Sequence, residues 1–358
     1  MTIYIVDLEA VDTRYTKEWK KHLPEQLKRH TNNEVVNISG GDTPQKTTPG
    51  AFLNFGGTNV YKSNQLAKIG EMFCKGEVKD GDYFLYTDAW NPTVIQLKYM
   101  AELLGVKIKI GGMWHAGSYD PADFLGRLIG KKPWVRLAEE SMYETFDHNF
   151  FATQFHTDMF SDTFIKLVTR KLDAQANKKI KRVGWPMEYM ERNLEQYKNM
   201  PKKKQILFPH RLAPEKQLDI FQDLKDSIGS EYDFIVCQEK TLSKVEYHNL
   251  LGESKLIFSA NLQETLGISW YEGALLDVIP MVPNRLSYKE MAIKEFAYPS
   301  EWTIDIEHYR KHKQEVIDKI HDYMENYTKY IPLIWKQREI LKNQFFSGKA
   351  LYEVVKYG

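Results

Sequence analysis

The sequence predicts an α/β protein built from two units, each a parallel sheet covered by helices. Short apolar runs alternate with amphipathic stretches long enough to form helices, the pattern that crossover connections between parallel strands produce. This alternation stops at the turn-forming segment from Gly184 to Pro186 and then begins again. A chain of 358 residues is also long enough for two domains of ordinary size. We therefore expect two Rossmann-like domains.

The first domain, which we place at residues 1–183, is expected to begin with a strand and to alternate strands with helices. Its apolar runs predict strands at Ile3–Val6, Glu34–Ile38, Asp82–Tyr86, Val106–Gly111 and Phe151–Gln154. Its amphipathic stretches predict helices at Lys17–His30, Lys62–Phe73, Thr93–Leu104 and about Ser161–Leu172.

The second domain, which we place at residues 184–335, is expected to follow the same plan. Its apolar runs predict strands at Gln205–Pro209, Asp233–Cys237, Lys255–Ser259 and Ile279–Val282. Helices are expected at Glu215–Ile228, at Lys244–Leu251 and throughout the tail that begins near Ile306. The last segment, residues 336–358, is expected to be a helix that crosses back to the first domain.

Composition limits the classes of function. The net charge is +1, so no overall field would attract nucleic acid or anionic lipid. The only two cysteines, Cys74 and Cys237, lie far apart in the sequence, which argues for a reducing cytoplasm and against a disulfide framework. No run approaches the roughly 18 apolar residues of a membrane-spanning helix, and the first residues do not resemble a signal peptide. We expect a cytoplasmic protein with no integral membrane segment.

Two glutamates are the most informative residues of the second half. Glu264 and Glu272 lie eight positions apart in a segment that reads as a strand end, a glycine turn and a helix. We expect both carboxylates to face one pocket at the N-terminus of that helix. A helix N-terminus favours an anionic group such as a diphosphate.

Two cations precede these glutamates. Arg211 and Lys216 follow the predicted strand Gln205–Pro209, on the loop and the first helical turn after it. A guanidinium offers a two-pronged donor and an ammonium a point charge, so the pair can clamp a diphosphate. Taken alone, the two residues carry almost no signal, because most lysines and arginines are ordinary solvated side chains. The glutamates that follow them favour the diphosphate interpretation.

Together these motifs resemble the retaining, nucleotide-sugar-dependent glycosyltransferases that have the E-x7-E motif and the GT-B fold, the family 4-like type. The matching elements run from about Gly184 to Asn284. The resemblance implies two facing Rossmann-like domains with a donor cleft between them, and a nucleotide sugar as donor. It departs from the family at Asp277 and Val278, where a small residue and a glycine are usual, and at the first strand.

The resemblance also implies roles for individual residues. Arg211 and Lys216 would bind the donor diphosphate, and Glu264 would hold hydroxyls of the donor sugar near its reacting carbon. Glu272 would accept hydrogen bonds from the ribose. The phosphates would be capped by backbone N–H groups of Thr265, Leu266 and Gly267. Because cations and a helix N-terminus can stabilise the leaving diphosphate, we expect no essential metal ion or cofactor.

The first strand lacks the usual glycine-rich turn of the family. The segment from Asp7 to Thr16 stands in its place, and the segment from Asn54 to Ser63 is a candidate substitute for the turn. His115 follows the predicted strand Val106–Gly111, where related enzymes place a histidine near the donor sugar. It is a candidate catalytic residue together with Glu264, Arg211 and Lys216, although a single histidine is as readily structural.

The sequence does not identify the acceptor. Asp88, Trp90, Trp114 and Tyr119 are candidate acceptor contacts, and Asp88 reads equally well as a helix cap. The acceptor could be a glycan, a lipid-linked sugar approached through the basic helix Lys17–Arg29, or modified DNA.

The chain is similar in style to phage enzymes that glycosylate hydroxymethylated pyrimidines in DNA, whose flipped base would stack on an aromatic ring. Basic runs at Lys178–Arg182 and Lys202–Lys204 could follow a phosphate backbone, but such runs are usually solvated surface. A third interpretation is a non-catalytic sugar-nucleotide or glycan-binding module. The sequence assigns no oligomeric state.

Overall fold

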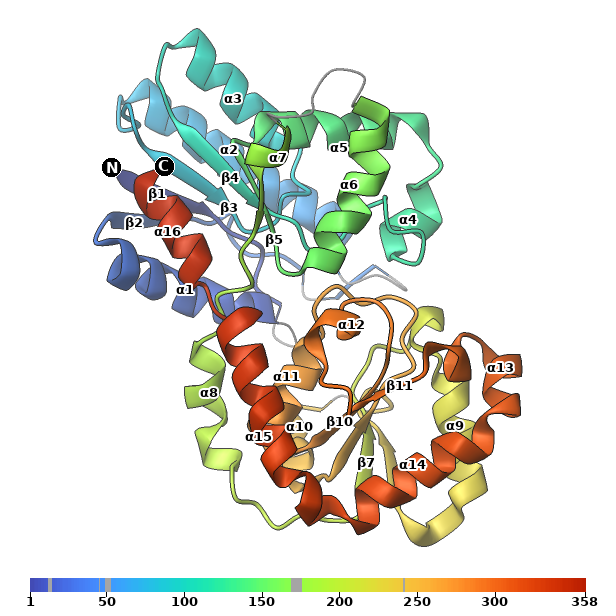
Figure 1. Ribbon diagram of the computed structural model, residues 1–358. Coiled ribbons are helices and arrows are strands. Elements are labelled where there is room, and N and C mark those ends of the chain that lie inside the picture. The colour runs from blue at the N-terminus through green and yellow to red at the C-terminus, as the bar shows by residue number, and fades with distance from the viewer. Residues whose placement is uncertain (12–14, 45, 49–52, 169–175, 241) are drawn as a thin grey trace. The chain divides into compact units, whose positions relative to one another are not determined.

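The computed structural model describes residues 1–358 except 12–14, 45, 49–52, 169–175 and 241, and it divides into two compact units (Figure 1). The first unit comprises Met1–Met187 and Ser347–Gly358, and the second comprises Glu188–Phe346. Each unit holds one parallel sheet with helices around it. The prediction of two Rossmann-like α/β domains is confirmed.

The first sheet has six strands in the order β2-β1-β3-β4-β5-β6, and all its neighbouring strands are parallel. The strands are β1 (Thr2–Val6), β2 (Glu34–Ile38), β3 (Tyr83–Tyr86), β4 (Lys109–Met113), β5 (His148–Phe151) and β6 (Ile180–Arg182). The chain moves from β1 to β2 in one direction and then returns past β1 to β3. The strand order therefore reverses between β1 and β3, and in open parallel sheets ligands bind outside the carboxyl ends of the strands at such a reversal.

Helices of the first unit connect and cover these strands. They are α1 (Tyr15–Thr31), α2 (Phe55–Cys74), α3 (Thr93–Leu103), α4 (Phe124–Ile129), α5 (Pro133–Thr145), α6 (Gln154–Val168), α7 (Ala176–Lys179) and α16 (Lys349–Tyr357). The last helix, α16, packs against α1 (Figure 1), and the ring of Tyr352 stacks on His30 with their centroids 4.7 Å apart. The end of the chain thus belongs to the first unit.

The second sheet has five strands in the order β11-β10-β9-β7-β8. They are β7 (Gln205–Phe208), β8 (Asp233–Val236), β9 (Leu256–Phe258), β10 (Ile279–Pro283) and β11 (Ala297–Tyr298). The helices are α8 (Tyr189–Leu194), α9 (Leu218–Ile228), α10 (Lys244–Glu253), α11 (Ile268–Leu275), α12 (Tyr288–Met291), α13 (Ile306–Lys311), α14 (Lys313–Glu325) and α15 (Tyr327–Gln344). Here the strand order reverses between β7 and β9.

The aromatic tail belongs to the core of the second unit. Tyr309, Tyr323 and Tyr327 are buried in one cluster with Phe258 of β9 and Tyr298 of β11. Rings at helical spacing that bury against neighbouring elements contribute to packing.

Several elements differ from the sequence prediction. Helices α4 and α5 were not predicted, although Pro133 opens α5 at a position that suits proline. The strand expected at Phe151–Gln154 ends instead at Phe151, because the hydroxyl of Thr153 accepts the N–H of His156 and so begins α6. The helix expected at Ser161–Leu172 starts earlier, and its residues 169–172 lie outside the described part of the chain.

The prediction of a glycine-rich turn from Asn54 to Ser63 is wrong, because this segment forms the start of helix α2. Asn54 is the N-cap of α2, and its side-chain oxygen accepts the N–H of Gly57 at 2.8 Å. Gly56 and Gly57 therefore lie in the first turn of a helix. An asparagine cap followed by residues that can continue as a helix stabilises that conformation over an open turn. The other segment considered there, Asp7 to Thr16, includes residues 12–14, which the structure does not describe.

Among the described residues, no helix combines the length and the apolar character needed to cross a membrane.

Candidate functional site

The loops after β7 and β9 meet at the strand-order reversal of the second sheet. Strands β7 and β9 are neighbours, so their carboxyl ends open onto the same place. The N–H of Leu262, on the loop after β9, donates to the carbonyl oxygen of Glu215, on the loop after β7, at 2.8 Å. This contact brings the segment that holds Arg211 and Lys216 against the segment that holds Glu264.

Lys216 is the central cation of this site. Its side chain is 7% exposed, and its ammonium group donates to the carbonyl oxygen of Gln263 at 2.5 Å. The same nitrogen lies 3.5 Å from Oε2 of Glu264. A buried ammonium needs such partners, because removing its charge from water without them would cost roughly several kcal/mol of folding free energy.

Glu264 occupies the start of helix α11. Its Oε1 accepts the backbone N–H of Gly267 at 2.9 Å and that of Leu266 at 3.4 Å. Gly267 has a φ of +78°, and a side chain there would also press against the ring of Tyr288. Glycine is therefore required at the turn that aims these N–H groups at the carboxylate.

The charge of Glu264 is stabilised despite its position. Burial raises the pKa of this carboxyl, but Lys216, His210 and the two backbone N–H groups together lower the pKa below its usual value. The carboxylate is thus ionised at neutral pH. It sits where a cation and the first N–H groups of a helix converge, an arrangement that binds anions.

His210 supports this arrangement as a neutral group. It is buried, and its Nε2 lies 2.6 Å from the hydroxyl oxygen of Ser259. Burial, and next the charge of Lys216, lower its pKa to about 3. The sequence analysis did not select this residue, although its place directly before Arg211 at the end of β7 was a usable signal.

Arg211 is paired with a carboxylate of its own segment. Its Nη2 pairs with Oε1 of Glu215 at 2.9 Å, and its side chain is 34% exposed while that of Glu215 is buried. The guanidinium is thus held by one carboxylate and partly open to solvent. Arg211 and Lys216 flank the short helical turn Pro214–Lys216, so both belong to one local segment.

Glu272 is placed against helix α10 in the structure. Its Oε2 accepts the hydroxyl of Tyr247 at 3.1 Å, and its Oε1 lies 3.6 Å from Nε2 of His248. Burial, and next the charge of Glu272, raise the pKa of the Cys237 thiol to about 12. Cys237 follows β8, so Glu272, Tyr247 and Cys237 form a second cluster of the unit.

Thr265 is half-buried on the loop between the two glutamates.

Two residues that the sequence analysis did not select hold the loop after β9 in place. Arg285 donates to the backbone carbonyl oxygens of Asn261 (2.7 Å), Ala260 (2.6 Å), Ser300 (2.9 Å) and Thr303 (3.0 Å). The Nε2 of Gln217 donates to two of the same oxygens, at Ala260 (2.5 Å) and Thr303 (2.7 Å). Because Gln217 directly follows Lys216, these bonds tie the Lys216 segment to the loop that carries Glu264.

The candidates of the first unit are held by their own neighbours. His115 is half-buried, with Nδ1 2.7 Å from the hydroxyl of Tyr15 and Nε2 2.6 Å from the carbonyl oxygen of Thr87. Asp88 accepts the N–H of Trp90 at 3.1 Å and lies 3.5 Å from the ammonium of Lys62. It therefore caps a turn and does not cap helix α3.

Three aromatic candidates differ in exposure. Trp90 is half-buried and its indole N–H donates to Glu139 at 2.8 Å. Trp114 is fully buried and donates to Asn149 at 2.8 Å. Tyr119 is buried with its hydroxyl 2.6 Å from Nε2 of His156. Stacking of a ligand on Trp114 or Tyr119 would therefore require these rings to leave the core.

Each lysine of the basic run Lys202–Lys204 has a hydrogen-bond or ion-pair partner. The ammonium of Lys202 donates to the carbonyl oxygen of Leu276 at 2.6 Å, and burial lowers its pKa to about 8. Lys203 pairs with Glu253 at 2.6 Å and Lys204 with Glu325 at 3.0 Å. Lys203 and Lys204 therefore behave as paired surface residues, whereas Lys202 is bonded to a backbone carbonyl oxygen. Across the described ranges, no group of three or more His, Cys, Asp or Glu side chains is arranged to hold a metal ion.

Comparison with solved structures identifies the fold. Sucrose-phosphate synthase from Thermosynechococcus elongatus is similar with a TM-score of 0.62 at 10% identity, over 99% of this chain and 97% of that one. The catalytic domain of starch synthase IV from Arabidopsis thaliana, bound to ADP and acarbose, gives 0.59 at 11% identity, over 99% and 98%.

The pneumococcal O-GlcNAc transferase GtfA, in complex with UDP and GlcNAc, gives a TM-score of 0.54 at 11% identity. The match covers 83% of this chain but 60% of GtfA. No protein-family model and no curated protein matches this chain. The structural likenesses establish the GT-B fold of two Rossmann-like domains, as the sequence predicts.

Proposed function

We propose that this protein is a retaining glycosyltransferase that moves a sugar from a nucleoside-diphosphate sugar to an acceptor hydroxyl. The observation that carries the proposal is the anion site of the second unit. There the Lys216 ammonium and the N–H groups of Leu266 and Gly267 converge on one carboxylate, that of Glu264. A diphosphate has the charge and the acceptor oxygens that such a site stabilises.

In this proposal the donor diphosphate takes over the donors that now serve Glu264. Lys216 and the N–H groups of Thr265, Leu266 and Gly267 bind the phosphates, and Arg211 adds its guanidinium from the same segment. The carboxylate of Glu264, released from the helix N-terminus, accepts hydroxyls of the donor sugar. Glu272, in the neighbouring cluster with Tyr247, accepts hydrogen bonds from the ribose.

The proposed reaction breaks the bond between the anomeric carbon and the diphosphate oxygen. The acceptor oxygen forms a new bond to that carbon on the same face, and the leaving diphosphate takes the acceptor proton. Negative charge grows on the leaving group in the transition state, so fixed donors there lower the barrier. His115 is kept as a candidate for holding a sugar hydroxyl or the leaving phosphate from the first unit.

Three similarities support the proposal at the level of chemistry. The solved structures that share the fold include a sucrose-phosphate synthase, a starch synthase bound to ADP and an O-GlcNAc transferase bound to UDP. All three proteins are sugar-transferring enzymes, and two of them are bound to a nucleoside diphosphate. This similarity favours a nucleotide sugar as the donor here. The spacing of Glu264 and Glu272 supports the E-x7-E type. Both cysteines are free and Cys74 is exposed, which supports a cytoplasmic location.

A screen of purified protein against UDP-, GDP-, ADP- and TDP-sugars tests the proposal. We expect one nucleotide class to raise the melting temperature and to be slowly hydrolysed, because water can replace the acceptor. Lys216→Met and Arg211→Ala should weaken both effects. Lys225→Met, an exposed lysine on α9, is the matched control and should leave them unchanged. Binding without turnover would favour a sugar-nucleotide-binding module, and no binding of any donor would contradict the proposal.

A further inference from the structure

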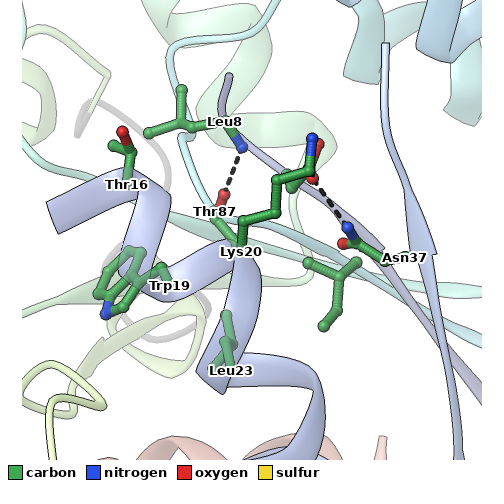
Figure 2. A pocket seen from close by; sticks show the side chains of 9 residues that line it. Leu8, Thr16, Trp19, Lys20, Leu23, Asn37 and Thr87 are labelled. Carbon is green, nitrogen blue, oxygen red and sulfur yellow. Dashed lines mark hydrogen bonds and ion pairs between the residues drawn. The ribbon is translucent and has the colours of Figure 1, made fainter. Parts of the chain in front are cut away.

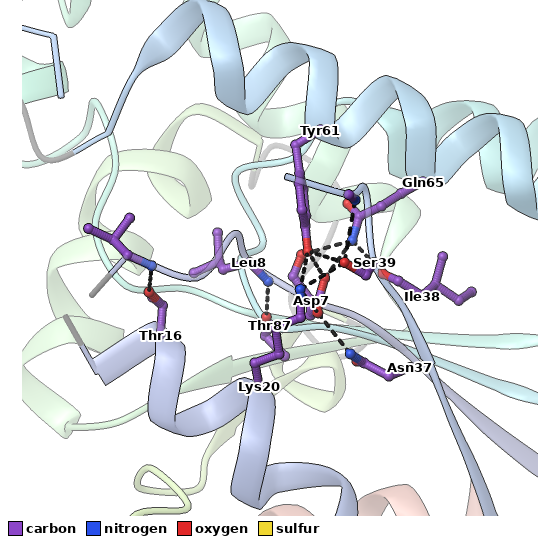
Figure 3. Close-up of polar contacts among 12 residues, drawn as sticks. Asp7, Leu8, Thr16, Lys20, Asn37, Ile38, Ser39, Tyr61, Gln65 and Thr87 are labelled. Atoms are coloured by element: carbon purple, nitrogen blue, oxygen red, sulfur yellow. Dashed lines mark hydrogen bonds and ion pairs between the residues drawn. The ribbon is translucent and has the colours of Figure 1, made fainter. Parts of the chain in front are cut away.

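The strand-order reversal of the first unit is filled by its own side chains. Asp7, which follows β1, accepts the hydroxyl of Tyr61 and the amide of Asn37 (2.8 Å), and it lies 3.6 Å from the ammonium of Lys20 (Figure 3). The pocket lined by Asp7, Asn37 and Lys20 leaves space for about one water molecule (Figure 2). The polar groups at this place therefore satisfy one another.

A larger exposed surface of the first unit lies on helices α3 and α5. Five large apolar side chains there are between 38% and 69% exposed, namely Ile95, Tyr99 and Leu103 on α3 and Trp134 and Leu137 on α5. Within each helix they recur every three or four residues, so they line one side of it. We refer to these five residues as the α3–α5 face.

The two rows of side chains belong to one surface. Helices α3 and α5 pack against each other, and they connect β3 to β4 and β4 to β5. These are successive crossovers in one direction across the sheet, and right-handed crossovers of this kind place both helices on the same side of it. The helices bury Val94 and Leu97 of α3 and Val135 and Met142 of α5. The α3–α5 face therefore points away from the sheet.

The α3–α5 face is large for a protein that acts as a monomer. With about 200 Å² for each fully exposed large side chain, its five residues present on the order of 600 Å² to solvent. The largest apolar patch on a typical monomer is about 300–600 Å², and a standard interface takes about 800 Å² from each partner. The face and the polar residues around it can thus supply one half of an interface.

The charges at the two ends of α5 are of opposite sign. Lys131 and Lys132 directly precede the helix, are exposed, and have no ion-pair partner among the residues that the structure describes. Glu140 and Glu144 lie in its second half. Glu144 pairs with Lys179 at 3.1 Å but is still 50% exposed. The face is therefore basic where α5 begins and acidic where it ends.

This distribution is the reverse of the one that stabilises an isolated helix. The first turn of α5 holds no acidic residue, its last turn holds no basic one, and Lys132 at the N-cap makes no side-chain capping bond. A helix favours negative charge at its N-terminus and positive charge at its C-terminus. Carboxylates supplied by another molecule at the start of α5 would correct this mismatch and pair with the two lysines.

We propose that the protein forms a twofold symmetric dimer in which the α3–α5 face of one copy packs against the same face of a second copy. The two α5 helices run antiparallel across the interface. Lys131 and Lys132 of each copy then lie beside Glu140 and Glu144 of the other, and a twofold axis makes this pairing occur twice. A parallel arrangement would instead place lysine against lysine. No residue of the proposed donor site belongs to this face, so the proposal does not depend on the proposed function.

Sedimentation velocity of the full chain at about 1 to 100 μM tests the proposal, since interfaces at the small end of the stable range have affinities of this order. We expect the wild type to change from monomer to dimer as the concentration rises. Tyr99→Arg and Leu137→Arg should each weaken association by at least about tenfold, because the new charge would be buried against an apolar surface. Tyr357→Arg, at an exposed position of α16, is the matched control and should dimerise as the wild type does.

Charge reversal tests the antiparallel arrangement. One variant combines Lys131→Glu with Lys132→Glu, and the other combines Glu140→Lys with Glu144→Lys. Each should self-associate at least about tenfold more weakly than the wild type, because like charges then meet at both ends of the interface. An equimolar mixture of the two should recover dimers, since every lysine end again meets a glutamate end. Melting temperatures close to that of the wild type verify that each variant is folded.

Three results would overturn the proposal. The first is a wild type that remains a monomer over the whole concentration range, including one that binds vesicles of phosphatidylcholine and phosphatidylglycerol, which would assign the face to a membrane. The second is a dimer that neither Tyr99→Arg nor Leu137→Arg weakens, which would place the interface elsewhere. The third is a mixture of the two charge-reversal variants that associates no better than either variant alone.

Discussion

Glu264 holds the place that the proposed function assigns to a phosphate. Its carboxylate receives the N–H of Gly267 at 2.9 Å and lies 3.5 Å from the ammonium of Lys216. In the proposed function, the donor diphosphate competes with this side chain for the same partners. On that proposal, the protein without donor is stabilised by its own carboxylate, and donor binding includes the free energy of moving it.

The first prediction follows from this competition. Glu264→Gln removes the negative charge from the anion site, so a nucleoside diphosphate without sugar should bind about tenfold more tightly, a difference of roughly 1.4 kcal/mol. Sugar transfer should fall by about 100-fold or more, because the group that orients the sugar is lost. Calorimetric titration and a turnover assay measure the two effects. Glu307→Gln, an exposed glutamate of α13, is the control. Weaker nucleotide binding in Glu264→Gln would contradict the competition.

The second prediction concerns pH. The pKa of His210 is lowered to about 3 by burial and by Lys216, whereas an unfolded histidine titrates near its ordinary pKa of about 6.5. As the pH falls, this histidine is therefore protonated in the unfolded chain before it is protonated in the folded protein. The stability that the neutral histidine provides is complete above pH 6.5 and is lost as the pH falls toward 3, at about 1.4 kcal/mol per pH unit.

Urea unfolding at pH 7 and pH 5 measures this dependence. In His210→Gln the free energy of unfolding should fall less between the two pH values than in the wild type. His308→Gln, at an exposed position of α13, should keep the wild-type dependence. His156, in the first unit, also has a pKa lowered to about 3, by burial and then by the charge of His115, so the dependence should be reduced rather than abolished. An unchanged dependence in His210→Gln would show that this histidine is protonated in the fold.

Among individual residues, the sequence predicted the positions of side chains that directly follow β7 and β9. It missed side chains that reach a strand end from the middle of a helix. Arg211, Lys216 and Glu264 follow strands directly, so strand ends locate them. Asp7 also follows a strand, but its partners Tyr61 and Gln65 arrive from the middle of α2. Nothing local in the sequence indicates that a tyrosine and a glutamine on a helix will meet a carboxylate at another strand end.

At the scale of elements, the proposed donor site depends on two loops that are joined by side chains. Gln217 adopts a left-handed backbone conformation, with a φ of +53°, directly after Lys216. That conformation is unfavourable for a residue other than glycine, and the hydrogen bonds of Gln217 to Ala260 and Thr303 stabilise it. Arg285 binds the same two carbonyl oxygens. The two side chains fix Lys216 relative to the loop of Glu264.

The third prediction tests this junction. Arg285→Lys keeps a positive charge but replaces the planar fork by one ammonium, which cannot reach all four carbonyl oxygens. The free energy of unfolding should fall by about 2–3 kcal/mol, and nucleotide binding should weaken with it. Arg310→Lys, an exposed arginine of α13, should change neither. Equilibrium unfolding and nucleotide titration measure both effects. Wild-type nucleotide affinity in Arg285→Lys would show that the loop keeps its position without this residue.

Strand positions were predictable because parallel strands are buried on both faces and read as continuous apolar runs. Strands β1, β2, β7 and β10 appear where the sequence places them, within a residue at each end. Helices α4 and α5 were missed, because the stretch from Phe124 to Thr145 mixes charged and apolar residues. In α5 the buried positions include Glu139, whose carboxylate accepts bonds from Trp90, Ser118 and Arg136. A buried charged residue interrupts the apolar pattern on which the helix prediction depends.

At the scale of the whole molecule, the chain leaves the first unit and returns to it. The expected boundary at 183/184 and the observed one at Met187/Glu188 both fall between β6 and α8. The return occurs after Phe346, and α16 then packs on α1 through Tyr352. The amphipathic pattern of the last residues predicts a helix, but the position at which the chain changes units depends on tertiary packing, which no local pattern records.

The fourth prediction concerns this returning helix. Tyr352 is buried and stacks on His30, whereas Tyr357, in the last turn of the same helix, is 74% exposed. Tyr352→Ala should lower the free energy of unfolding of the first unit by about 3–5 kcal/mol, as expected for loss of a buried aromatic ring. Tyr357→Ala should be neutral. Hydrogen exchange separates the units, since protection should fall in β1 and α1 but not in β7 or β9. Equal loss of protection in both sheets would contradict the assignment of α16 to the first unit.

The measurement that tests the central claim most directly is calorimetric titration of the wild type, Lys216→Met and Lys225→Met with UDP, GDP, ADP and TDP. The account predicts that one of these nucleotides binds the wild type and Lys225→Met equally and binds Lys216→Met at least about tenfold more weakly, as expected when a buried ammonium that faces a diphosphate is removed. Equal affinity in all three proteins, or no binding to any of them, would show that the Lys216 and Glu264 cluster is not a nucleotide site.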